Sequence, residues 1–144
     1  MLTASDIALV RTSFAKVRPI QTIAADLFYD RLFAIAPQLR NLFPAELTQQ
    51  KQKLMAMIAA AVGGLDRLDT LVGTVKALGA RHSNYGVTTE HYAIVGEALI
   101  WTLERGLGPA FTPDVRAAWT NVYGILAATM QAGAAEAAEL QVAE

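Results

Sequence analysis

The most regular part of the sequence is residues 65–84, LDRLDTLVGTVKALGARHSN. Within it, four apolar residues and a histidine recur at alternating spacings of three and four: Leu68, Leu71, Val75, Leu78 and His82. One face of an α-helix repeats in this way, so the stretch predicts an amphipathic helix with His82 on its apolar side. Gly86 is expected to end this helix as a C-cap in the left-handed conformation.

Helical periodicity extends over nearly the whole chain, and prolines and glycines fall at the joints between periodic segments. The expected helices cover about residues 3–17, 20–35, 37–43, 46–63, 65–84, 88–106 and 112–138, and the tail over about residues 138–144 is expected to fray. There is no internal repeat and no linker-like segment, so residues 1–144 are predicted to form one all-α domain of about seven to eight helices. Periodicity alone does not distinguish one all-α fold from another.

The composition restricts the class of protein. Of the 144 residues, 53% are hydrophobic, so the chain must bury most of its apolar surface or cover an apolar cofactor. A formal net charge of -1 lacks the basic excess of a nucleic-acid-binding protein. The absence of cysteine excludes disulfides, thiolate metal ligands and cysteine nucleophiles. Neither a signal peptide nor an apolar run of membrane-spanning length is recognisable, so we expect a cytoplasmic protein without a membrane partner.

Motifs of the common enzyme classes are missing. The sequence contains no G-x-S-x-G, P-loop, G-x-G-x-x-G or H-E-x-x-H pattern. The glycines of Gly63-Gly64 lie between expected helices, where they indicate a turn. Asp66 and Asp69 are interpreted as charges in the first turn of a helix.

His82 is one of only two histidines. Burying an imidazole costs free energy unless both nitrogens are used, so His82 is either a hydrogen-bonded core residue or a metal ligand. As a ligand, it would bind the metal through one nitrogen and donate to a carbonyl or carboxylate through the other. The second histidine, His91, is expected on the surface, so a zinc site has too few ligands. Haem needs only one protein ligand and is the metal cofactor that these residues can support.

Two polar residues share the apolar faces of their expected helices. Tyr29 follows Leu27 and Phe28, and Gln50 precedes Leu54 by one turn. Each has an ordinary structural interpretation, because Gln50 could lie at a helix edge in water and Tyr29 could bond to backbone in the core. The residues themselves leave both alternatives open.

Three segments together resemble one family. LFYDRLFAIAPQLRNLF (27–43), LGARHSNYGVTTEHYAIVGEAL (78–99) and LGPAFTPDVRAAWTNVYG (107–124) are similar to bacterial single-domain globins of the flavohaemoglobin type and to neuroglobin. The resemblance spans nearly the whole chain and implies a globin fold around haem b, iron protoporphyrin IX. It also implies that His82 is the proximal iron ligand, that Phe43 packs on the haem, and that Tyr29, Gln50 and Leu54 face the bound gas.

Further haem contacts follow from the same resemblance. Tyr92 matches the proximal tyrosine of flavohaemoglobins, and Val95 lies one turn further along the same expected helix. Lys53 and Arg81 are candidate partners of the haem propionates, although a plain surface charge explains either equally well. The glutamate that flavohaemoglobins carry on the last helix is replaced by Ala134, which weakens the case for strong electron donation from the proximal side.

A tyrosine and a glutamine over the iron resemble the distal pair of high-affinity bacterial globins. The resemblance therefore implies a five-coordinate ferrous haem that binds O2 tightly and reversibly, with CO and NO as further ligands. The main alternative is a nitric oxide dioxygenase working with a separate reductase. A globin sensor, which usually carries an output domain, and a haem-free domain for an apolar ligand are the other classes considered.

Overall fold

The computed structural model describes residues 2–84 and 87–143. Within these residues there are six α-helices and no strand. The α-helices are α1 (Ala4–Val17), α2 (Gln21–Ile35), α3 (Thr48–Gly63), α4 (Leu68–Asn84), α5 (Thr89–Leu107) and α6 (Pro113–Ala143). Short 3₁₀ helices connect them: η1 (Arg18–Ile20), η2 (Pro37–Leu42), η3 (Leu65–Arg67) and η4 (Gly108–Ala110). The predicted all-α class is confirmed.

Three of the expected helix boundaries need correction. The segment expected as a short helix over 37–43 is the 3₁₀ helix η2, and residues 65–67 form η3 rather than the first turn of α4. The helix expected from Glu46 begins at Thr48, because the Glu46 carboxylate accepts a hydrogen bond from the Thr48 backbone N–H at 2.9 Å. α6 is a helix over Pro113–Ala143, and the fraying expected over about residues 138–144 stays a prediction. Gly86 lies outside the described residues.

Side chains cap α1, α5 and α6 at their N-termini, and at α6 the Val115 N–H donates to Thr112 Oγ1 at 3.2 Å. Thr3 forms a capping box with Asp6 at the start of α1. At the start of α5, the Thr88 backbone N–H donates to His91 Nδ1 at 3.0 Å. His91, expected as a solvated surface residue, is therefore a partly buried capping residue.

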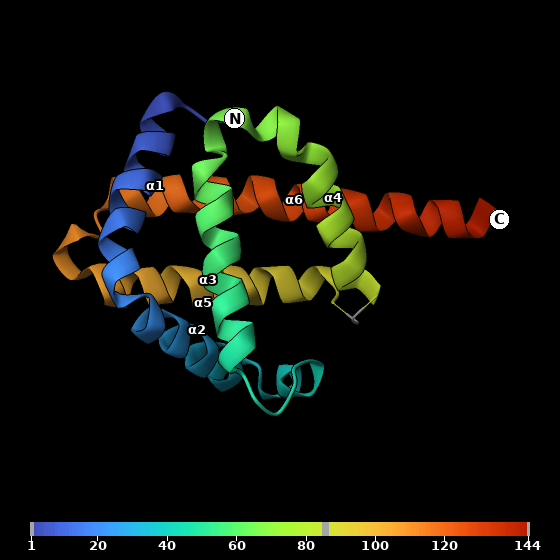
Figure 1. The fold of residues 1–144 in the computed structure, drawn as a ribbon, viewed down its shortest axis with the longest axis horizontal. Coiled ribbons are helices and arrows are strands. Elements are labelled where there is room, and N and C mark those ends of the chain that lie inside the picture. Colours follow the sequence, from blue (N-terminus) through green and yellow to red (C-terminus); the bar gives the residue numbers. More distant parts are fainter. Residues whose placement is uncertain (1, 85–86, 144) are drawn as a thin grey trace.

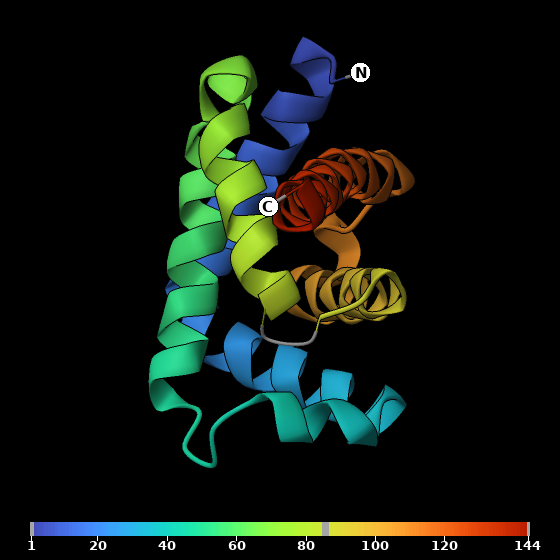
Figure 2. The same cartoon turned by 90° about the vertical axis from the view of Figure 1, so that its right-hand side faces the viewer.

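The helices form two crossed layers. α5 and α6 lie side by side, and α1, α3 and α4 cross over them (Figure 1). Turned by 90°, the molecule shows α3 and α4 on the same side of the α5–α6 pair (Figure 2). The two crossing helices have different partners, because α3 packs on α1 and α2 whereas α4 packs mainly on α6. In the described part of the chain, no helix is long and apolar enough to cross a membrane.

The larger part of the core lies between α1, α5 and α6. Its centre is a ring pair, Phe14 and Trp119, with centroids 6.3 Å apart. The indole Nε1 of Trp119 donates to Ser13 Oγ at 2.8 Å, so the one polar atom of this ring is satisfied within the core. A second apolar cluster forms between α2, η2 and α5: Phe28, Tyr29, Leu32, Ala36, Leu39 and Ala98.

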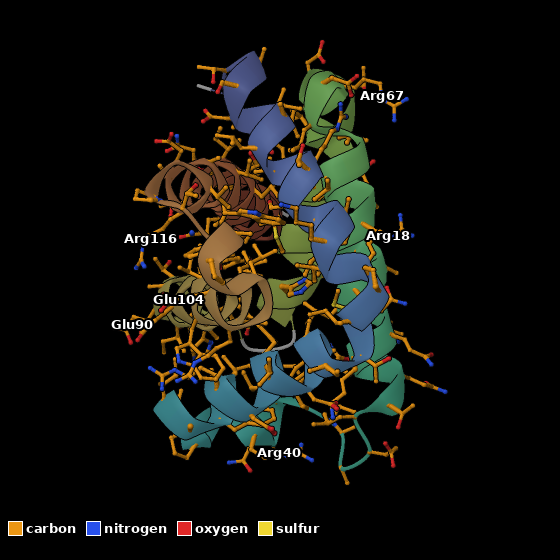
Figure 3. The ribbon with its side chains drawn as sticks, turned by 90° about the vertical axis from the view of Figure 1, so that its left-hand side faces the viewer. Arg18, Arg40, Arg67, Glu90, Glu104 and Arg116 are labelled. Carbon is orange, nitrogen blue, oxygen red and sulfur yellow. The ribbon has the colours of Figure 1, made fainter. Side chains whose placement is uncertain are left out.

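Arg11 connects α1 to the end of α3. Its guanidinium donates to the carbonyls of Val62, at 3.2 Å, and Gly63, at 3.0 Å, and pairs with the Asp66 carboxylate at 3.0 Å. Carbonyls in the last turn of a helix lack partners within the helix, so Arg11 supplies the missing donors. The hydrogen bond from Arg11 lowers the pKa of Asp66. Other charged residues, such as Arg116 and Glu104, point outward from the surface (Figure 3).

Candidate functional site

His82 lies in the last turn of α4 and is partly buried. Its Nδ1 is 2.8 Å from the backbone carbonyl of Leu78, one turn earlier. A carbonyl oxygen can only accept, so Nδ1 carries the proton and Nε2 is the nitrogen whose lone pair can bind a metal. Among the described residues, no group of three or more His, Cys, Asp or Glu could hold a metal ion. An imidazole bonded to the backbone through Nδ1 fits a cofactor that needs one protein ligand, as haem does.

Tyr29 and Gln50 are brought together from two helices. Tyr29, on α2, is 3% exposed, and Gln50 lies in the first turn of α3. Burial raises the pKa of the Tyr29 hydroxyl, and a hydrogen bond with the Gln50 side chain partly offsets that rise. The hydroxyl therefore keeps its proton at neutral pH. Two polar groups that can donate hydrogen bonds thus meet at the edge of the apolar cluster that contains Tyr29.

Aromatic rings hold Tyr29 in its orientation. Its ring lies edge-on to Phe28, with centroids 5.0 Å apart, and edge-on to Phe43, at 5.6 Å. Phe33 completes the group through an edge contact with Phe43 at 5.5 Å. Rings that meet edge to face interlock, and each such pair contributes about 0.5–1.5 kcal/mol beyond its buried area. We call these four residues, Phe28, Tyr29, Phe33 and Phe43, the aromatic cluster.

Leu54 and Val95 pack next to the aromatic cluster from α3 and α5 and are partly buried. Leu54 also lines a small, mostly apolar pocket of about 20 Å³, whose walls include Phe14, Leu99 and Trp119. The structure thus places Tyr29, Phe43, Gln50, Leu54 and Val95 in one region, and their roles at the haem and the bound gas stay predictions.

An ion pair joins α2 and α3 beside Tyr29 and Gln50. Lys51 Nζ lies 2.8 Å from the Asp26 carboxylate, and this hydrogen bond raises the pKa of Lys51. Gln50 precedes Lys51, and Asp26 lies one turn before Tyr29, so the ion pair lies next to the contact between Tyr29 and Gln50. Because both side chains are partly solvated, the pair contributes little stability.

Outside Gln50 the surface is hollowed into a cleft of about 470 Å³. Its walls are formed by Pro44, Glu46, Thr48, Gln49, Gln50 and Lys53. Lys53 thus shares a cleft with the polar residue expected above the iron. Arg81 is exposed on α4, the helix that carries His82. The roles of Lys53 and Arg81 at the propionates stay predictions.

Arg40, which sequence reasoning missed, anchors the loop after η2. Its guanidinium donates to the carbonyls of Pro44 and Ala45, each at 2.8 Å, and lies 5.3 Å above the Phe33 ring. These contacts tie the loop that follows Phe43 to the aromatic cluster. No signal in the sequence identifies them, since the acceptors are backbone groups whose placement depends on the loop conformation.

Tyr92 occupies the first turn of α5 and is partly buried, which raises the pKa of its hydroxyl. Its backbone carbonyl accepts a hydrogen bond from the Tyr123 hydroxyl of α6 at 2.5 Å, and burial strongly raises the pKa of Tyr123. The Tyr123 ring lies over Gly96, where a Cβ atom would come within 2.7 Å of it. Sequence reasoning missed this contact; its one signal is a glycine on the apolar face of α5.

An all-α fold, an imidazole bonded through Nδ1 and a hydroxyl–amide pair beside aromatic rings fit one class, haem proteins that bind small ligands. The family model described as Globin matches residues 26–130. This chain belongs to the globin family, and haem is its cofactor, as the sequence predicted.

Similar proteins come from animals and bacteria. Neuroglobin-1 of Oncorhynchus mykiss is 34% identical, and the match covers 96% of each chain. The flavohemoprotein of Bacillus subtilis is 33% identical. The match covers 88% of this chain but only 33% of that relative's length. A solved structure from Rhodothermus marinus, an engineered carbene transferase described as a "putative nitric oxide dioxygenase", superimposes with a TM-score of 0.87. It is 26% identical to this chain, and all of both chains is covered.

Proposed function

We propose that this globin binds dioxygen reversibly and with high affinity at a five-coordinate ferrous haem. The haem, when bound, supplies the iron that takes up the gas. His82 would hold the iron through Nε2, since Nδ1 bonds to the Leu78 carbonyl. Phe43, Leu54, Tyr92 and Val95 would line the haem, and Lys53 and Arg81 would approach its propionates.

The contact between Tyr29 and Gln50 carries this proposal. A buried hydroxyl that keeps its proton and a neighbouring amide can each donate to the oxygen atoms of a ligand. Each such hydrogen bond is worth roughly 1–3 kcal/mol when shielded from water, and two of them together correspond to about 30-fold to about 10,000-fold in affinity. The aromatic cluster fixes the hydroxyl before the ligand arrives, so little ordering cost remains at binding.

Five-coordination is supported by the placement of the two histidines. A glutamine amide is a poor iron ligand, and the second imidazole, His91, accepts the Thr88 N–H at the start of α5. Neither is suited to occupy the second axial position. The ferrous form is therefore expected to keep that position open for a gas.

Absorption spectroscopy and stopped-flow kinetics test the proposal. The purified protein is examined as isolated, after dithionite, and after exposure to O2 or CO. We expect a Soret band, one broad visible band in the ferrous form, two sharp bands with O2, and slow O2 release. Two sharp bands in the ferrous form without gas would show an internal sixth ligand and overturn the five-coordinate assignment. A protein without a Soret band after haem reconstitution would overturn the proposal as a whole.

Nitric oxide dioxygenation is the second candidate, favoured by the description of the Rhodothermus marinus structure and by the flavohemoprotein relative. The reaction consumes one NO, one O2 and one electron per nitrate formed, so it needs a separate reductase. Sustained NADH-driven loss of NO with an added flavin reductase, at a rate above that of free haem, would support it. A single turnover that stops would favour oxygen binding. The reductase partner and the cytoplasmic location stay predictions.

A further inference from the structure

Helix α4 crosses α6 (Figure 1). Two glycines lie at this contact. A Cβ atom built on Gly79 of α4 would lie 1.9 Å from the carbonyl oxygen of Met130 on α6. One built on Gly133 of α6 would lie 2.1 Å from the carbonyl oxygen of Lys76 on α4. The contact is reciprocal, since each glycine meets the residue three positions before the other. Here the two helices touch backbone to backbone.

The other glycines of these helices show that this arrangement is particular to Gly79 and Gly133. A Cβ on Gly73 of α4, or on Gly124 of α6, would meet nothing within 4 Å. A glycine inside a helix costs about 0.8–1.0 kcal/mol relative to alanine. At Gly79 and Gly133 the close approach of two helices accounts for that cost.

An ion pair closes the same crossing. Lys76 Nζ lies 2.9 Å from the Glu136 carboxylate, and the two residues stand one turn from Gly79 and Gly133. Both side chains are partly solvated, so the pair adds little energy, but it restricts sliding of α4 along α6. We call Lys76, Gly79, Gly133 and Glu136 the glycine crossing.

The glycine crossing lies one turn before His82. Gly79 follows Leu78, whose carbonyl accepts the hydrogen bond of His82 Nδ1, and precedes His82 by three residues. α6 is also the main packing partner of α4. The distance between α4 and α6 at Gly79 therefore sets the position of the His82 imidazole. Because the contact is between backbone atoms, no side chain there can rearrange to compensate for a change in this distance.

We propose that Gly79 and Gly133 are positioning residues for the axial imidazole: their missing Cβ atoms fix α4 on α6 and so fix His82 relative to the haem. The proposal rests on the function proposed above. A methyl group at Gly79 would lie about 1.5 Å closer to the Met130 carbonyl oxygen than ordinary van der Waals contact allows. Helix α4 would therefore have to move away from α6 by a similar distance. Iron–imidazole bonding is sensitive to such a shift, since a misplacement of about 1 Å matters at a functional site.

The test compares four glycine-to-alanine variants of the haem-loaded protein. Gly79→Ala and Gly133→Ala add a methyl group at the crossing, and Gly73→Ala and Gly124→Ala add the same group to the same helices in open space. The readouts are the Fe–His stretching band in the resonance Raman spectrum of the ferrous form, the rate of haem transfer to an acceptor protein, and thermal unfolding. We expect a shifted band and about tenfold faster haem loss in the first pair. We expect the wild-type band and equal or higher stability in the second pair.

The outcomes separate a positioning role from a merely structural one. If Gly79→Ala unfolds more easily but keeps the wild-type band and rate of haem loss, the proposal is overturned. Should both crossing variants fail to fold, Lys76→Met removes the ion pair without adding bulk at the contact; a smaller shift of the same band supports the proposal, and an unchanged band overturns it. If the wild-type protein takes up no haem, the proposed function is overturned. If the wild type binds haem and Gly79→Ala has the same Fe–His band and the same rate of haem loss, only this inference is overturned.

Discussion

The two sides of the candidate haem site are built in opposite ways. On the distal side, Tyr29 and Phe43 are held by interlocking aromatic rings from α2 and the end of η2. On the proximal side, α4 is held on α6 at Gly79 and Gly133, where side chains are missing. Side chains can be exchanged one at a time, so the distal side can be tuned for a ligand. A backbone contact has no such freedom, so we expect the proximal side to hold His82 in one place.

The largest expected effect comes from removing His82, the proposed iron ligand. His82→Gly should lose haem at least about 100-fold faster than wild type, since the iron keeps no protein ligand. Added imidazole should restore the Soret band by filling the space of the lost side chain. The measurement is haem transfer to an acceptor protein, followed by absorbance with and without imidazole.

The other histidine provides the matched control. His91→Gln changes the residue that caps α5 and should keep the wild-type spectrum. A His82→Gly protein that retains its haem as firmly as wild type would show that the ligand lies elsewhere.

On the distal side, Tyr29→Phe keeps the ring and removes the hydroxyl. We expect O2 to dissociate about 10–100-fold faster, which corresponds to the loss of one charge-assisted hydrogen bond. Gln50→Leu should have a smaller effect, and the double variant should show less than the sum of the two, because the side chains interact with each other. Stopped-flow displacement of O2 by CO measures all three rates.

Tyr123→Phe removes a hydroxyl from α6 that bonds to the Tyr92 carbonyl. It is expected to lower stability and leave O2 release within about twofold of wild type. If it speeds O2 release as much as Tyr29→Phe does, the distal assignment of Tyr29 is wrong.

The support of the distal side can be weakened through Arg40. Arg40→Met keeps the aliphatic stem but loses the hydrogen bonds to Pro44 and Ala45, at a cost of about 1–2 kcal/mol of unfolding free energy. The loop after Phe43 should then be cut faster in limited proteolysis. Arg18 is an exposed arginine that points outward in Figure 3, and Arg18→Met serves as the control. Equal cleavage in the two variants would argue against an anchoring role.

The comparison also explains what could be predicted from the sequence. Helices and their order follow from local periodicity, and His82, Tyr29 and Gln50 stand out because each is a polar residue on an apolar face. Tyr29 and Gln50 lie on different helices, separated in sequence by η2 and the loop after it, so their contact depends on how α2 and α3 pack. Such packing is a tertiary property that spacing alone does not encode.

The sequence does not predict the glycine crossing either, because this contact also depends on how two helices pack. Gly73 and Gly79 lie six residues apart on one helix, and only the second touches α6. A glycine within a helical pattern indicates a local cost, but not whether another helix lies above it. The 3₁₀ form of η2 was also not predicted. It forms because a six-residue segment that begins with Pro37 has few donors for α-helical hydrogen bonds.

The smallest expected effect concerns the junction between the two sides, where η3 joins α3 to α4. Arg11 lowers the pKa of Asp66 there, so the folded protein favours the charged carboxylate. The stabilisation is present above the unfolded-state pKa of 3.8 and is lost as the pH falls through the lower folded-state value. Asp66→Asn should therefore lower the unfolding midpoint at pH 7 by no more than about 2 °C, and the difference from wild type should vanish on acidification. Asp69→Asn, one turn further along, should not reproduce this pH-dependent difference. A difference for Asp66→Asn that persists unchanged in acid would mean that the carboxylate's charge is not what holds the junction of α3 and α4 to α1.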